Sequence, residues 1–177
     1  MKSLVSQPET SGGNEPPASR TVSTPAATRP FPAPKRVLVV DDDAVVRASL
    51  AAVLDCEGYE VIMAADGQAA IKCVLDHQPH VVLLDLNMPN MDGWTAFSKL
   101  ESVQPLLPVI VITARPHQYQ NAVSLGVDAF MEKPLSFPVL LRAIHRLAHE
   151  PIPRHTKRIT SPGFVTRFLH NQMSTPS

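Results

Sequence analysis

Side chains that could do chemistry follow four short apolar runs of this 177-residue sequence. The runs VLVV, VVLL, VIVI and AFME are followed by Asp41-Asp42-Asp43, Asp85, Thr113-Ala114 and Lys133-Pro134. Carboxylates that gather in one place repel one another unless a cation neutralises them. A divalent ion such as Mg²⁺ does this with one or two carboxylates, a phosphate group and water. The residue types therefore predict a divalent-cation site, provided that the four runs end at the same place.

The apolar runs are typical of strands, and helical patterns separate them. Strands are predicted at 36–40, 60–64, 80–85, 108–113 and 128–132, and helices at 44–57, 67–76, 93–102, 118–125 and 136–148. Strands that are apolar on consecutive positions are typical of sheets buried on both faces. The alternation predicts an α/β fold: a doubly wound, five-stranded parallel sheet with helices on both faces, flavodoxin-like, in strand order 2-1-3-4-5.

In this architecture ligands bind beyond the carboxyl ends of the strands, beside the first and third strands. All four polar groups lie at such ends. Singly, most of these residues have a simpler interpretation: Asp43 as the N-cap of the following helix, Asp41 and Asp42 as loop residues, Thr113 as a satisfied strand-end hydroxyl and Lys133 as a surface charge. Their joint placement favours a site.

Composition excludes several classes of protein. Sixteen basic residues balance sixteen acidic ones, which removes any argument from global charge for nucleic acid or anionic membranes. Two cysteines cannot form a disulfide framework. The apolar runs are far shorter than the ~20 residues of a membrane helix, and the N-terminus has no signal-peptide core. We expect a cytoplasmic protein without membrane insertion.

Proline and charge divide the chain into three parts. Seven of the eighteen prolines fall in residues 1–34, which we expect to be a disordered, Pro-rich extension. Residues 35–150 carry the periodic pattern of a single domain. Residues 151–177 form a basic, Pro-containing tail, expected to be mostly disordered, in which 163–172 could form a short helix.

The segments VLVVDDD, VVLLDLNMPNMDG, VIVITA and FMEKP resemble, in order and spacing, the receiver (response regulatory) domain of bacterial two-component response regulators. The resemblance covers about 36–149. It implies a phosphoprotein that uses Mg²⁺ and takes its phosphoryl group from a sensor histidine kinase or a histidine phosphotransfer protein.

The resemblance also assigns roles around the acceptor. Asp85 matches the phosphoacceptor. Asp41 and Asp42 match the acidic pair that binds Mg²⁺, Asp42 directly and Asp41 partly through water. Asn87 matches the residue whose backbone carbonyl completes the metal site, so the implied ligands are Asp41, Asp42, Asp85 and Asn87.

Residues of the last two strands match the contacts of the phosphoryl group. Lys133 matches the lysine that contacts the acceptor and the phosphoryl oxygens, and the Lys133-Pro134 bond is expected to be cis. Thr113 matches the hydroxyl that turns toward the phosphoryl group, and the small Ala114 leaves access for the donor. Phe130 matches the aromatic switch residue that moves with Thr113.

Two further matches concern loops. Met88-Pro89 and Gly93 match the loop after the third strand, where we expect glycine to supply permissive dihedrals. Arg115 lies where receivers vary and could affect the lifetime of the phosphorylated form.

The tail is too short for a helix-turn-helix module, so we expect a stand-alone phosphorylation switch that does not bind DNA directly. Its signal would leave through the face of helix 4, strand 5 and helix 5 to an unknown protein. Enzyme activity beyond self-phosphorylation and autodephosphorylation is not expected. Two alternatives remain open: an Asp-nucleophile phosphohydrolase of the haloacid dehalogenase type, and a degenerate receiver that acts as a scaffold.

Overall fold

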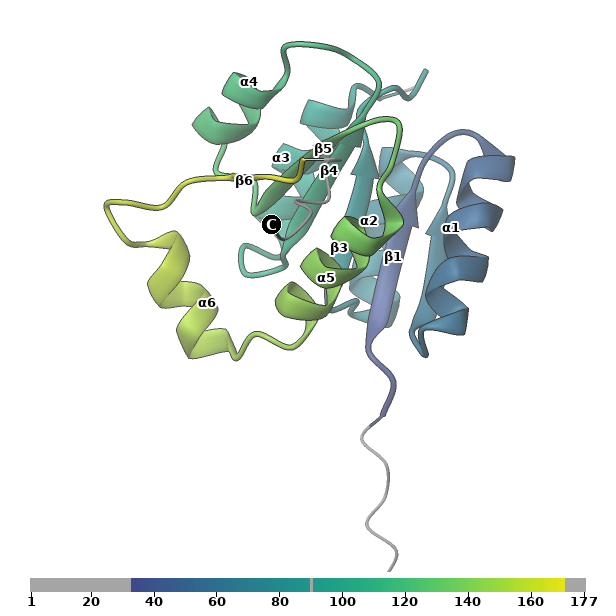
Figure 1. Cartoon of the computed structure of the whole chain (residues 1–177), viewed down its shortest axis with the longest axis horizontal. Coiled ribbons are helices and arrows are strands. Elements are labelled where there is room, and N and C mark those ends of the chain that lie inside the picture. Colours follow the sequence, from purple (N-terminus) through teal and green to yellow (C-terminus); the bar gives the residue numbers. More distant parts are fainter. Residues whose placement is uncertain (1–32, 90, 171–177) are drawn as a thin grey trace, which may run out of the picture. The chain divides into compact units, whose positions relative to one another are not determined.

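A computed structural model describes residues 33–89 and 91–170 (Figure 1). Nearly all of the Pro-rich extension predicted at 1–34, and residues 171–177 of the tail, lie outside the described residues. The elements are β1 (Arg36–Val40), α1 (Ala44–Cys56), β2 (Glu60–Ala64), α2 (Gly67–His77), β3 (Val81–Asp85), α3 (Gly93–Val103), β4 (Val109–Thr113), α4 (Tyr119–Ser124), β5 (Ala129–Glu132), α5 (Phe137–Ala148), α6 (Ile152–Ile159) and β6 (Arg167–Phe168).

The strands form one parallel sheet in the order β2-β1-β3-β4-β5-β6. The predicted order of the first five strands is confirmed, and β6 is an addition at the β5 edge. The register places Asp85 opposite Ile112 and Thr113 opposite Glu132. The ends of β1, β3, β4 and β5 therefore lie along one edge of the sheet.

Alternate residues of each strand enter two separate cores, because successive side chains point to opposite faces. Leu38 and Val40 join the core beneath α2, α3 and α4. Val37 and Val39 join the core beneath α1 and α5. Since both faces are apolar, polar side chains are left to the strand ends.

Aspartate side chains fix where two helices begin. Asp43 caps α1 by accepting hydrogen bonds from the backbone N–H groups of Val45 and Val46. Asp66 caps α2 in the same way. An N-cap of this kind is worth about 1 kcal/mol and holds the chain entering the helix. The cap role predicted for Asp43 is confirmed, which separates it from the two aspartates before it.

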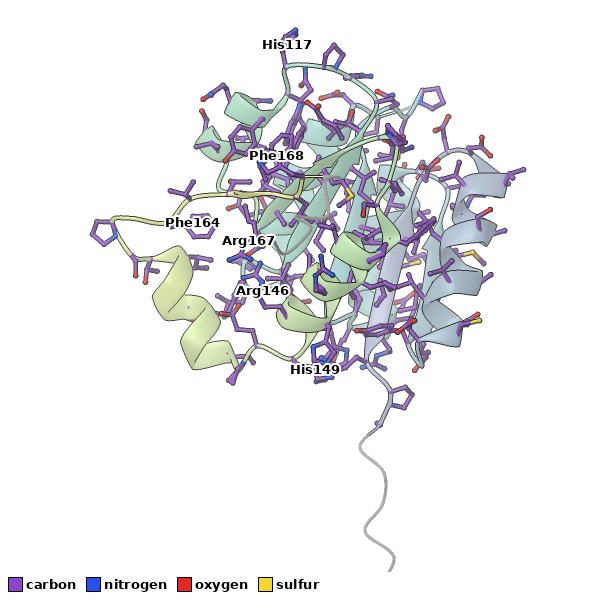
Figure 2. The ribbon with its side chains drawn as sticks, in the orientation of Figure 1. His117, Arg146, His149, Phe164, Arg167 and Phe168 are labelled. Carbon is purple, nitrogen blue, oxygen red and sulfur yellow. The ribbon has the colours of Figure 1, made fainter. Side chains whose placement is uncertain are left out.

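The C-terminal segment corrects one prediction. Residues 151–170, expected in a mostly disordered tail, form α6 and then β6, which pairs with β5 (Figures 1 and 2). The short helix considered possible at 163–172 is absent from the described part of that range, which holds a turn and a strand. Burial explains the difference, because Thr166 and Leu169 are almost fully enclosed.

Gly93 lies at the end of the predicted loop after the third strand, but the reason predicted for a glycine there was wrong. The left-handed glycines among the described residues are Gly58 and Gly126, so Gly93 does not serve by unusual dihedrals. A Cβ at Gly93 would lie 2.5 Å from the Cα of Leu86. The first turn of α3 therefore packs against the backbone just after Asp85, and only glycine permits that approach.

No helix in the described part of the chain has the length and apolar character needed to cross a membrane.

Gly93→Ala should lower the free energy of unfolding by about 1–3 kcal/mol, the usual cost of overpacking, because the new methyl group meets backbone. Gly163→Ala is the matched control, since a Cβ there has no neighbour within 4 Å. Its effect should stay within about 0.5 kcal/mol. Urea denaturation measures both, and equal effects would contradict the close-packing explanation.

Candidate functional site at the carboxyl edge of the sheet

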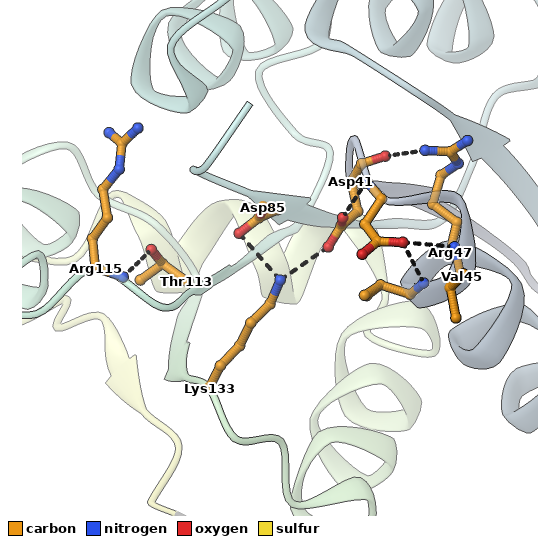
Figure 3. Close-up of polar contacts among 9 residues, drawn as sticks. Asp41, Val45, Arg47, Asp85, Thr113, Arg115 and Lys133 are labelled. Carbon is orange, nitrogen blue, oxygen red and sulfur yellow. Dashed lines mark hydrogen bonds and ion pairs between the residues drawn. The ribbon is translucent and has the colours of Figure 1, made fainter. Parts of the chain in front are cut away.

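Four polar side chains meet where β1, β3, β4 and β5 end (Figure 3). Asp41 directly follows β1, Asp85 and Thr113 are the last residues of their strands, and Lys133 follows β5. Asp41, Asp85 and Thr113 are each no more than 3% exposed. The structure thus brings together the residues that the sequence placed at separate strand ends.

Lys133 joins the two buried carboxylates. Its ammonium donates a hydrogen bond to Asp41 Oδ2 at 3.0 Å and lies 3.6 Å from Asp85 Oδ1. Its closer partner is therefore Asp41 rather than the predicted acceptor. The backbone N–H of Lys133 donates to the carbonyl of Thr113, and the Lys133–Pro134 peptide bond is cis.

Asp41 is held from several sides. Its Oδ1 accepts a hydrogen bond from the backbone N–H of Asp43, and its carbonyl accepts one from the guanidinium of Arg47. Asp85 is held less completely, because its Oδ1 accepts no hydrogen bond from any described residue. Asn87 Oδ1 is likewise buried without a donor within the described ranges. The edge is therefore rich in unused acceptor atoms.

Burial sets the ionisation of this group. It raises the pKa of the Asp85 carboxyl, a shift that the charge of Lys133 opposes and that of Asp41 reinforces. Burial also lowers the pKa of Lys133, but its hydrogen bond to Asp41 and the charges of Asp85 and Asp41 outweigh burial and leave that pKa raised. The ammonium stays charged at neutral pH, whereas ionised Asp85 calls for more positive charge.

Asp41, Asp42 and Asp85 fit a divalent cation. One carboxylate oxygen from each lies within 4.8 Å of the other two. Asp42 is exposed, so a cation could reach the group from solvent. Hard cations with oxygen ligands suit such a set, since an ion would supply the positive charge that one ammonium cannot.

The neighbouring side chains leave the site open on one side. Thr113 Oγ1 accepts a hydrogen bond from the backbone N–H of Arg115 at 2.9 Å, so the hydroxyl proton is not used in that bond. Ala114 is exposed. The Arg115 side chain turns outward to Asp92 at 3.4 Å, an exposed ion pair that contributes little to stability.

The sequence matches a family model, described as the response regulator receiver domain, over residues 37–145. This chain belongs to that family. The chain is 37% identical over 122 residues to the response regulator MprA of Mycolicibacterium vanbaalenii, an alignment that covers 68% of this chain and 53% of the relative. The chain therefore spans about half the length of the curated relatives it matches.

Solved receiver structures share the fold. A CheY-like receiver domain protein from Methanospirillum hungatei matches with a TM-score of 0.62 and 27% identity, over 70% of this chain and 98% of the other. The response regulator TrrA of Thermotoga maritima, in complex with Mg²⁺ and BeF, matches with a TM-score of 0.60 and 30% identity, over 64% and 98%.

Two contacts near the site had no signal in the sequence. Arg47 reaches back from α1 to the carbonyl of Asp41, and nothing in its spacing distinguishes it from a solvated helix residue. Phe130 is fully buried and packs against Tyr119 and Phe168, with ring centroids 5.8 and 5.6 Å away. The aromatic partners come from α4 and β6, far apart in the sequence.

Asp85→Asn should raise the free energy of unfolding at neutral pH when metal is chelated. Because the folded-state pKa of Asp85 is raised, the folded protein binds more protons than the unfolded chain, and its stability falls as pH rises. The advantage of the variant should therefore appear as pH rises above about 4, and level off beyond the raised pKa. Urea denaturation in EDTA across this pH range measures it.

Asp92→Asn serves as the control, since Asp92 is exposed and should change stability by less than about 0.5 kcal/mol. If Asp85→Asn is no more stable than wild type at neutral pH in EDTA, burial does not disfavour the ionised carboxylate.

Proposed function

We propose that this receiver domain switches when Asp85 takes a phosphoryl group from the phosphohistidine of a sensor histidine kinase or a histidine phosphotransfer protein. The observation that carries the proposal is the buried Asp85, whose Oδ1 has no hydrogen-bond donor among the described residues and faces Lys133. An oxygen–phosphorus bond would form as the phosphorus–nitrogen bond breaks, and the departing imidazole would keep the electron pair.

Asp41, Asp42 and Asp85, with the backbone carbonyl of Asn87, would hold Mg²⁺. The cluster of carboxylate oxygens within 4.8 Å supports this set, and the TrrA structure contains Mg²⁺. When bound, Mg²⁺ supplies the charge that offsets the three carboxylates and the incoming phosphoryl group.

Lys133 and Thr113 would hold the phosphoryl oxygens. A half-buried ammonium 3.6 Å from Asp85 needs little rearrangement to contact a group attached there, which would lower the cost of charge developing in transfer. The Thr113 hydroxyl keeps its proton free to donate to a phosphoryl oxygen. Exposed Ala114 leaves the approach open to the donor.

The output would be a change at the face of α4, β5 and α5. Movement of the Thr113 hydroxyl toward the phosphoryl group would vacate space beside β5, which the apolar ring of Phe130 could fill without leaving a polar group unpaired. The phosphoryl group would thus bias a two-state equilibrium, by no more than the difference in its contacts in the two states. A downstream protein would read that face.

The phosphoacceptor assignment predicts that Asp85→Asn gains no phosphoryl group from acetyl phosphate and Mg²⁺, because an amide is not a nucleophile. Wild type should gain one phosphoryl group, and EDTA should suppress it. Intact mass measures the adduct. Asp43→Asn is the matched control, since asparagine caps a helix as well as aspartate does and the variant should be phosphorylated like wild type.

An undiminished adduct on Asp85→Asn would overturn the assignment. Multiple turnover of a generic aryl phosphate by the wild type would instead favour the phosphohydrolase alternative. A wild type that takes no phosphoryl group at all would favour the scaffold.

Thr113→Ala should still accept the phosphoryl group, since Asp85, the metal ligands and Lys133 remain. It should lose most of the response of residues 118–147 to beryllofluoride and Mg²⁺, because the donor that would draw Phe130 is gone. Amide chemical shifts with and without beryllofluoride measure this. Thr113→Ser, which keeps the hydroxyl, should respond like wild type, and an equal response in Thr113→Ala would show that the coupling does not use this hydroxyl.

A further inference from the structure

The segment 166–169 extends the sheet beyond β5 (Figure 2). Arg167 pairs with Ala129 and Phe168 with Phe130, in parallel. The backbone N–H of Arg167 donates to the carbonyl of Asp128 at 3.3 Å, and that of Leu169 donates to the carbonyl of Phe130 at 2.7 Å. Main-chain pairing of this kind is how an extended peptide adds to an exposed sheet edge.

On the α4 side, the segment is held by two hydroxyl groups. Thr166 Oγ1 donates a hydrogen bond to the carbonyl of Ala122 at 3.1 Å, and Tyr119 Oη donates to the carbonyl of Thr166 at 2.8 Å. Thr166 is 1% exposed. These bonds tie the backbone and side chain of one tail residue to the helix of the proposed output face.

An aromatic cluster follows on the same side. The Phe168 ring packs against Tyr119 at 5.0 Å and against Phe130 at 5.6 Å between centroids. Phe130 is the residue whose movement would carry the signal in the proposed function. The tail therefore rests directly on the predicted switch residue.

On the α5 side, alternate residues of the segment meet the other core. Leu169 is 6% exposed and belongs to the core beneath α1 and α5. Arg167 and Leu169 line one groove together with Val139 and Ala143 of α5. The segment is thus seated between α4 and α5 along the edge of β5.

We infer that residues 166–169 are an internal ligand of the face formed by α4, β5 and α5. A partner using the β5 edge must displace this segment, and this edge beside α4 fits an extended peptide with a Thr-x-Phe pattern added in parallel to β5. A two-residue strand opens at low cost, but its covalent link keeps it at high effective concentration. We expect phosphorylation to release the segment, because movement of Phe130 would remove its packing against Phe168. This step rests on the proposed function.

Hydrogen exchange of the phosphate-free full chain tests the docking. The amides of Arg167 and Leu169 should exchange at least tenfold more slowly than in an unstructured peptide. Phe168→Ala should remove at least tenfold of that protection while leaving the amides of Leu83 and Ile110 unchanged. Val165→Ala, at a site 64% exposed, is the matched control and should exchange like wild type. Unprotected amides in wild type, or unaltered protection in Phe168→Ala, would overturn the inference.

Tyr119→Phe provides a milder variant, because it removes only the hydroxyl that donates to Thr166. It should speed exchange of the amides of Arg167 and Leu169 severalfold. If Phe168→Ala also loses protection at Leu83 and Ile110, and so destabilises the whole fold, Tyr119→Phe is the variant that tests the docking. No change in Tyr119→Phe under those conditions would count against the docking.

A synthetic peptide with the sequence of residues 162–170 tests whether the face accepts a ligand. It should bind Phe168→Ala at least tenfold more tightly than wild type, because the intact tail competes in wild type. A peptide with alanine at the position of Phe168 should not bind. Chemical-shift titration detects even millimolar binding. Equal binding to both proteins, or no binding to the variant, would therefore refute the inference that the tail occupies a peptide-binding edge at β5.

Beryllofluoride and Mg²⁺ test the release. They should speed exchange at Arg167 and Leu169 at least threefold in wild type and leave Asp85→Asn unchanged. If beryllofluoride binds but the rates stay the same, the release is wrong. If it does not bind at all, the phosphoacceptor proposal fails, while the docking result in the phosphate-free protein still stands.

Discussion

Two buried carboxylates share one ammonium at the carboxyl edge of the sheet, and the chemistry of the site depends on this imbalance. Lys133 hydrogen-bonds Asp41 and only approaches Asp85. Removing the lysine would leave two buried carboxylates without a cation, so we expect the site to depend on Lys133. The remaining demand for positive charge, together with the unused oxygen of Asp85, is what would make the edge receptive to the proposed cation and phosphoryl group.

The same edge was the easiest part of the molecule to predict. Strands buried on both faces need consecutive apolar residues, and this pattern marks each strand to within a residue at either end. Parallel strands then bring their carboxyl ends together whatever the loops do, so Asp41, Asp85, Thr113 and Lys133 had to converge. The cap at Asp43 was also predictable, because it depends only on the first turn of the following helix.

What the sequence could not show depends on distant contacts. Nothing local tells whether Lys133 binds Asp41 or Asp85, since both lie within its reach and the choice follows from the packing of three strands. The close approach that requires Gly93 depends on the path of Leu86. Residues 166–169 are too few for a periodic pattern, and their strand exists because β5 offers an unpaired edge flanked by Tyr119 and Phe130.

The β5 strand connects these two findings. Lys133 follows its last residue and reaches the carboxylates, while Ala129 and Phe130 in its first half pair with β6. A four-residue strand cannot change its position at one end without affecting the backbone pairing at the other, because the interior is close-packed. Coupling between two sites needs an element with two arrangements that both sites bias. Under the proposed function, β5, with Phe130 packed against Phe168 of the tail, would be that element, and the tail would add a second ligand to the equilibrium that the phosphoryl group would shift.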